Sequence, residues 1–302
     1  MSLNKLIQKI LKEADAWDKK YLDVTVHAIR RFESEESAQE LIYRFLNEEC
    51  RGTFNLANPS SKRLLLRELL PALLSHLVDD TKAESLRVTC AMATFLHDDW
   101  NFPEGGIEFD IGKAKKLIRN ALAGFDFIAR FEAVTYQNEY WQRGALKGPL
   151  VCFHCHCIIW TSASYSKLER LRKSLKHRFP RPLSREDGPH FARIKSPEGL
   201  GIILGYISKM PARGKRTDTT LKEYKVQRSR VISKRSYYEL FKELRKHDMY
   251  TFWLSGGEGA KILRETRSRL RARADCGRSH DLRGRRFWRG SHPGARWGAY
   301  RE

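Results

Sequence analysis

Residues 151–160 read Val-Cys-Phe-His-Cys-His-Cys-Ile-Ile-Trp, and this composition predicts a strand. Neighbouring side chains of a strand point to opposite faces. The odd-numbered positions are apolar throughout and predict a buried face, whereas the even-numbered positions include His154 and His156. These two imidazoles lie on one face, ~6.5 Å apart along the strand. They can therefore share one metal ion.

The preceding segment, residues 125–136, obeys the same rule. Its odd positions from Phe125 to Ala133 are apolar, and its even positions carry Arg130 and Glu132. Residues 137–148 join the two segments, so we expect an antiparallel hairpin in the middle of a sheet with helices on one face. Glu132 can then face His154 and His156 across the hairpin. Two histidines and a carboxylate suit a divalent cation with open positions for phosphate oxygens, such as Mg²⁺ or Mn²⁺.

Two other interpretations of these histidines stay open. They can be structural side chains on a partly buried strand. Alternatively, Cys152, His154, Cys155 and Cys157 can hold a structural zinc ion, although adjacent ligands on a strand diverge to both faces and lack the spaced pairs of zinc sites.

A third element of the candidate site lies in a helix predicted over residues 197–210. Four apolar side chains form one stripe of this helix and should face the core: Leu200, Ile203, Leu204 and Ile207. Tyr206 and Lys209 lie together on its flank. The Tyr206 hydroxyl can attack phosphorus, and Lys209 can lower the pKa of the tyrosine or hold the phosphate. The alternative is a half-buried aromatic residue beside a solvated lysine.

The remaining pattern predicts a mixed α+β fold. Residues 1–80 form a helical N-terminal segment, residues 81–212 a central domain in the order β, α, β, β, α, β, α, and residues 213–302 a basic extension that is partly helical and partly flexible. We expect an 86–96 strand, a 112–123 helix, a basic 166–179 helix and a 190–194 strand in the central domain. Helices near 237–246 and 260–273 follow it.

The charge of the chain favours a polyanionic partner. Its 57 basic and 36 acidic residues give a net charge of +21. Residues 1–80 hold 12 basic and 13 acidic side chains, whereas residues 211–302 hold 25 and 10, so nucleic acid should meet the second half of the chain. No export signal and no apolar run of the ~20 residues needed for a membrane span are present in the sequence. Six cysteines without a spaced framework favour a reducing compartment. We expect a cytoplasmic protein.

Basic residues flank the candidate site in sequence. Those predicted to bind DNA are Arg172, Lys173 and Lys176 in one helix, the run Arg213, Lys215 and Arg216, and Arg285, Arg286 and Trp288 in the tail. The tail interleaves arginine with aromatic side chains, as single-strand binders do to stack bases. A solvated basic tail with nonspecific affinity is the alternative interpretation.

Two motifs together resemble the HUH endonucleases: Phe153-His154-Cys155-His156-Cys157 on a strand, and Tyr206-Ile207-Ser208-Lys209 on a helix fifty residues later. The resemblance covers residues 86–211, and residues 88–96 do not match the first motif of the family. It implies a five-stranded antiparallel sheet, Mg²⁺ or Mn²⁺ bound by His154, His156 and an acidic or polar residue, and attack of Tyr206 on single-stranded DNA. The products implied are a 5′-phosphotyrosine link and a free 3′-hydroxyl.

The order of the motifs is similar to that of the rolling-circle replication initiators in this family, because the histidines precede a single tyrosine. The implied function is nicking and rejoining of single-stranded DNA at the replication origin of a plasmid or phage in a prokaryotic cell. The sequence has no phosphate-binding loop of the helicase type, so we expect a host helicase to unwind the DNA. The alternatives are a transposase or mobilisation protein with the same chemistry, and a noncatalytic DNA-binding protein.

Overall fold

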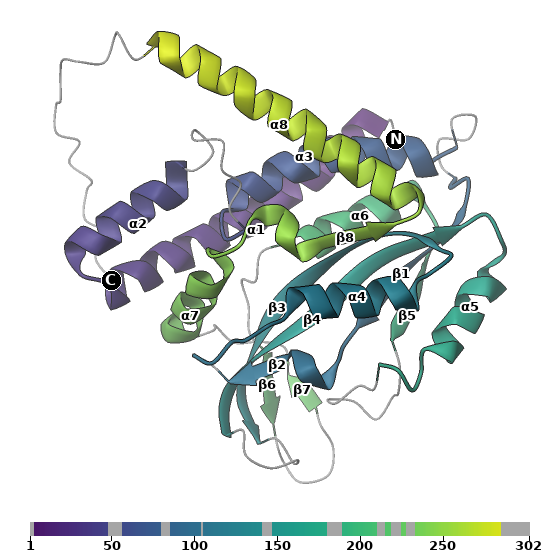
Figure 1. Ribbon diagram of the computed structural model, residues 1–302, viewed down its shortest axis with the longest axis horizontal. Helices are drawn as coiled ribbons and strands as arrows, with labels where there is room; N and C mark the ends of the chain where they lie inside the picture. Colours follow the sequence, from purple (N-terminus) through teal and green to yellow (C-terminus); the bar gives the residue numbers. More distant parts are fainter. Residues whose placement is uncertain are drawn as a thin grey trace.

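The computed structural model describes residues 3–47, 56–79, 85–103, 105–140, 147–179, 189–209, 215–218, 225–227 and 233–284. A largely antiparallel sheet with helices packed on it confirms the predicted α+β class (Figure 1). At its centre lies the predicted hairpin of β3 (Asp126–Tyr140) and β4 (Lys147–Thr161). Their register places Glu132 opposite His154 and Arg130 opposite His156.

The described sheet is larger than the expected five strands. Its order is β5-β1-β4-β3-β6-β7, with β1 at Thr89–Phe95, β5 at His190–Ile194, β6 at Lys215–Asp218 and β7 at Lys225–Gln227. Two short strands lie off this path: β2 (Asn101–Pro103) pairs with β4, and β8 (Trp253–Gly256) pairs with β3. Only the β3–β6 pair is parallel among the described pairs. Residues beyond 212 thus extend the central sheet.

The odd-numbered residues of β3 from 127 to 133 and of β4 from 151 to 159 form the odd face of the hairpin, which is apolar and buried, as predicted. Helices α4 (Ile111–Ala121), α5 (Tyr165–Ser174) and α7 (Lys234–Leu244) share one hydrophobic core with it. Within this core Phe153 stacks on Phe109 with ring centroids 4.1 Å apart. Burial of such rings is the main source of stability on this side of the sheet.

The even-numbered residues form the even face, which helices also cover. Helices α6 (Pro197–Ser208), α3 (Pro59–Leu77), α1 (Leu3–Phe32) and α8 (Glu258–Gly284) pack there around Ile128, Ile158 and Trp160. The prediction of helices on one face was therefore wrong. It was based on the polar residues of the even face. These three apolar residues must also be buried, and helices pack over them at one end of the hairpin.

The predicted helical character of the first 80 residues is seen in α1, α2 (Glu35–Asn47) and α3. Helix α1 crosses α6 closely, because a Cβ atom on Gly201 would lie 2.1 Å from Cδ1 of Ile10. Between α1 and α3, Asp18 and Lys62 form a buried ion pair. The N-terminal helices therefore rest directly on the helix that carries Tyr206.

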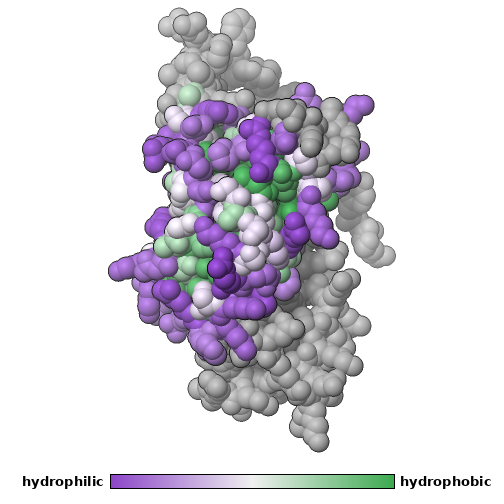
Figure 2. Space-filling view, turned by 90° about the vertical axis from the view of Figure 1, so that its right-hand side faces the viewer, coloured by the Kyte–Doolittle hydropathy of each residue, from purple (hydrophilic) through white to green (hydrophobic). Residues whose placement is uncertain are grey.

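Hydrophilic side chains border small apolar areas on the side of the molecule seen in Figure 2. Among the described residues, no helix combines the length and the apolar character that crossing a membrane requires.

Candidate metal centre and tyrosine helix

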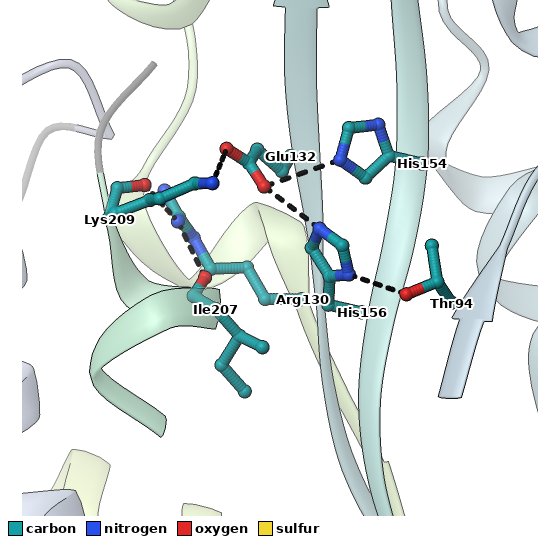
Figure 3. A network of polar contacts seen from close by, with 7 residues as sticks. All are labelled: Thr94, Arg130, Glu132, His154, His156, Ile207 and Lys209. Carbon is teal, nitrogen blue, oxygen red and sulfur yellow. Dashed lines mark hydrogen bonds and ion pairs between the residues drawn. The ribbon is translucent and has the colours of Figure 1, made fainter. Parts of the chain in front are cut away.

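Glu132, His154 and His156 converge on the even face of the hairpin (Figure 3). One ligand atom from each lies within 4.8 Å of the others. Oε2 of Glu132 is 3.3 Å from Nε2 of His154 and 2.9 Å from Nε2 of His156. All three side chains are buried. The strand alternation that grouped these residues in the sequence thus brings them together in the structure.

The electrostatics of Glu132 and His156 favour the protonation states that metal ligation requires. Burial opposes ionisation of Glu132, but hydrogen bonds from His154 and His156 outweigh it and hold the pKa of the carboxyl well below its usual value. Burial, followed by the neighbouring His154, lowers the pKa of His156 to about 4. At neutral pH the carboxylate is therefore ionised and the His156 imidazole is neutral.

Thr94 of β1 contacts His156 at Nδ1, the ring nitrogen that does not face Glu132, and this contact was not foreseen from the sequence. Its Oγ1 atom is 3.0 Å from Nδ1 of His156. A hydroxyl both donates and accepts, so Thr94 can accept the Nδ1 hydrogen while Nε2 presents its lone pair to a cation. The register of β1, which places Thr94 opposite His156, is the signal that could have revealed this residue.

This donor set fits a divalent cation. Two imidazole nitrogens and one carboxylate would hold it, and coordination positions would remain open for substrate oxygens. The zinc alternative gains no such cluster, because Cys155 and Cys157 lie in the core of the odd face, where burial raises the pKa of both thiols well above the usual value. Within the described ranges, the triad is the one group of His, Cys, Asp or Glu side chains placed to hold an ion.

Helix α6 brings Tyr206 and Lys209 to the triad. Ser196 caps its first turn and Pro197 occupies its first position. Of the four residues of the predicted stripe, Leu200, Leu204 and Ile207 are buried and Ile203 is half-buried. The Tyr206 ring lies 5.2 Å from the His156 ring, at an interplanar angle of 70°. Tyr206 is 43% exposed, so solvent and substrate can reach it.

Lys209 lies between the tyrosine and the carboxylate. Its Nζ atom is 3.7 Å from the centroid of the Tyr206 ring and 3.5 Å from Oε1 of Glu132. The two oxygens of Glu132 therefore have different neighbours, with the histidines at Oε2 and the lysine at Oε1 (Figure 3).

Arg130 is a positioning residue whose role the sequence did not reveal. It is buried on the even face two residues before Glu132, and its Nη1 atom donates to the carbonyl oxygens of Ile207 and Lys209, both at 2.9 Å. These carbonyls end α6 and lack partners within the helix. Arg130 therefore fixes the turn that carries Tyr206 to the strand that carries Glu132. Only its even-numbered position in the hairpin pointed to it in advance.

The structure separates the residues predicted to bind DNA. Arg172 and Lys173 lie on α5, and Lys176 lies in the turn that follows it; α5 packs on the odd face and so lies across the sheet from the triad. Lys215 and Arg216 lie on β6, where their backbones pair with Tyr136 and Gln137. Arg213, Arg285, Arg286 and Trp288 are outside the described residues.

No protein-family model, curated protein or solved structure matches the chain.

Proposed function

We propose that this protein is a metal-dependent endonuclease that nicks and rejoins single-stranded DNA at an origin, and thereby starts rolling-circle replication of a plasmid or phage. One observation carries the proposal: a buried Glu132, His154 and His156 triad lies beside an exposed tyrosine from a different element. If the histidines had only a structural role, an accessible nucleophile beside them would not be required. The HUH-type order of motifs and the net charge of +21 support the same proposal.

The chemistry follows from the positions of these side chains. Held by the triad, Mg²⁺ or Mn²⁺ would supply Lewis-acid polarisation of a phosphate oxygen. Tyr206, having lost its proton to water, attacks phosphorus through its phenolic oxygen. The bond from phosphorus to the 3′ oxygen breaks, and that oxygen takes up a proton to leave as a hydroxyl. Tyr206 keeps the 5′ phosphate as an ester, which the 3′-hydroxyl can attack in reverse to rejoin the strand.

Lys209 contributes a positive charge next to the reacting groups. At 3.7 Å from the centroid of the Tyr206 ring, it can hold the phosphate that the tyrosine attacks. Arg130 acts only through α6 and does not touch the substrate. A host helicase would open the duplex, and the reaction would take place in the cytoplasm of a prokaryotic cell.

A covalent adduct is the direct test of this activity. The protein is incubated with labelled single-stranded oligonucleotides and Mn²⁺, denatured, and separated by electrophoresis. We expect an adduct that resists denaturation, requires Mn²⁺, and disappears in Tyr206→Phe while DNA binding persists. The matched control is Tyr43→Phe, which changes another exposed tyrosine, on α2, and should keep the adduct.

The outcomes separate the alternatives. Binding that is indifferent to Mn²⁺, with no adduct from any oligonucleotide, would indicate a noncatalytic DNA-binding protein. An adduct formed only when two DNA ends are paired would indicate a transposase or mobilisation protein. An adduct that survives Tyr206→Phe would assign the nucleophile to another residue.

A further inference from the structure

A basic cleft lies between α4 and α8, and none of its lining residues was predicted from the sequence to bind DNA. Its volume is about 410 Å³. Four cationic side chains line it, two from each helix: Lys115 and Arg119 from α4, and Arg264 and Arg267 from α8. In Figure 1 these helices lie on either side of β8, which runs along the cleft.

The cations of this cleft repel one another and are poorly neutralised. Asp248 is the one acidic residue in its lining; one of its oxygens accepts the backbone N–H of Tyr250, 2.7 Å away, and its single charge faces four cations. Burial, then Arg119 and Arg267, lowers the pKa of Lys115 to about 8. Over the described residues, Lys115, Arg119 and Arg264 form no ion pair with an acid. Such convergence of like charges is unfavourable until an anion enters.

Neutral groups complete the lining. Thr251 and Ser255 bring hydroxyl groups, and Arg267 stacks over the Tyr250 ring with its guanidinium carbon 4.7 Å from the centroid. Arginine, lysine and small hydroxyl side chains are the groups that contact phosphate oxygens in protein–DNA interfaces. The composition of the cleft therefore matches a phosphodiester better than a carboxylate metabolite, which would need fewer cations.

Strand β8 connects this cleft with the candidate metal centre. Trp253, in the lining of the cleft, pairs with Arg130, which is two residues from Glu132 on β3. The backbone positions of Arg130 and Glu132 are ~6.6 Å apart along β3. Because one strand pair joins the lining of the cleft to the strand that carries Glu132, a polynucleotide bound at the metal centre can extend to the cleft.

We propose that the α4–α8 cleft binds the phosphodiester backbone of the DNA strand that is cut at the metal centre. The substrate class rests on the proposed function, whereas the cleft and its charges do not. The cleft would hold the strand in register without reading its sequence, because backbone contacts position DNA and carry no base information.

Salt dependence of DNA binding tests the cleft without any catalysis. We would measure the affinity of Tyr206→Phe protein for a fluorescent single-stranded oligonucleotide, in EDTA, over a range of salt concentrations. Each lost phosphate contact should reduce the slope of log Kd against log salt concentration by about 0.7. Adding Arg119→Gln and Arg264→Gln should thus reduce it by about 1.4. Both side chains are exposed, so the fold should persist, as circular dichroism would verify.

The matched control adds Lys19→Gln and Lys20→Gln, which remove two exposed charges from α1. The proposal is supported if the two cleft substitutions reduce the slope and the two control substitutions leave it unchanged. An unchanged slope for the cleft pair, or equal reductions in both, overturns it. Inorganic pyrophosphate that protects the parent protein but not the cleft variant from thermal unfolding, at an unchanged DNA slope, would identify a site for free anions and also overturn it. Failure to form a covalent adduct would affect none of these readings.

Discussion

The two faces of the β3–β4 hairpin bury side chains of opposite chemical character. On the odd face, Phe127, Phe131 and Phe153 are buried among apolar side chains. On the even face, Arg130, Glu132 and His154 are buried just as deeply, although burial of charged and polar groups is unfavourable. The odd face therefore stabilises the fold, and the even face buries polar groups: Arg130 is paired with the end of α6, and Glu132 and His154 belong to the triad proposed to hold a cation.

The even face is itself divided along its length. Ile128, Ile158 and Trp160 lie at one end under α3 and α8, and the triad lies at the other end beside Tyr206. A single strand can thus anchor helices at one end and present ligands at the other. If this division is correct, substitutions on the two faces should have separable effects on stability and on metal binding.

The largest expected effect on stability is on the odd face. Phe153→Ala removes a fully buried ring that stacks on Phe109, and should lower the free energy of unfolding by about 3–5 kcal/mol. Urea denaturation measures this, with Ile202→Ala as the control because that side chain is 48% exposed and should change the value by about 0.5 kcal/mol or less. A loss below about 1 kcal/mol for Phe153→Ala would show that the odd face is not the stabilising one.

The free energy of unfolding of the metal-free protein should depend on pH because His156 is buried on the even face. The unfolded chain protonates His156 near pH 6.5, whereas the folded chain does so only near pH 4. Between these values the unfolded state binds more protons, so stability falls as the pH is lowered, by on the order of 3 kcal/mol over the whole interval. In His156→Gln, the midpoint of unfolding should change less with pH over this pH range. Parallel wild-type and variant curves would contradict the assignment of the shift.

A smaller effect on stability, but a specific effect on activity, is expected at Arg130. Arg130→Met leaves the carbonyls of Ile207 and Lys209 without their donor, and should reduce the free energy of unfolding by roughly 2 kcal/mol. At saturating Mn²⁺ and DNA, the rate of adduct formation should fall while the affinity for Mn²⁺ is unchanged. Arg130→Lys keeps the charge and should recover part of the rate. Equal rates for all three proteins would mean that Arg130 does not position Tyr206.

The parts of the fold predicted from the sequence depend on short-range periodicity. Alternation along residues 125–136 and 151–160 gave the hairpin, its buried odd face and the grouping of Glu132 with the histidines, all of which the structure contains. The apolar stripe of α6 was equally legible, because helical spacing places Leu200, Leu204 and Ile207 together.

What was missed depends on contacts between residues far apart in the chain. The hydrogen bonds of Arg130 to the end of α6 span more than seventy residues, and the contact of Thr94 with His156 depends on which strand neighbours β4. Strand β8 is only four residues long, and its apolar pattern is too short to distinguish from a turn. The cleft between α4 and α8 arises from the packing of two helices, each of which alone has an ordinary basic surface.

The most direct measurement is a Mn²⁺ titration of the purified protein followed by electron paramagnetic resonance. One tightly bound Mn²⁺ per chain is expected, lost in Glu132→Gln and in His154→Gln, and retained in His97→Gln, which changes a histidine outside the triad. Phe153→Ala protein that remains folded should also retain it. Absence of bound Mn²⁺, or a bound ion that persists after Glu132 and His154 are both replaced, would contradict a metal centre on the even face of the hairpin.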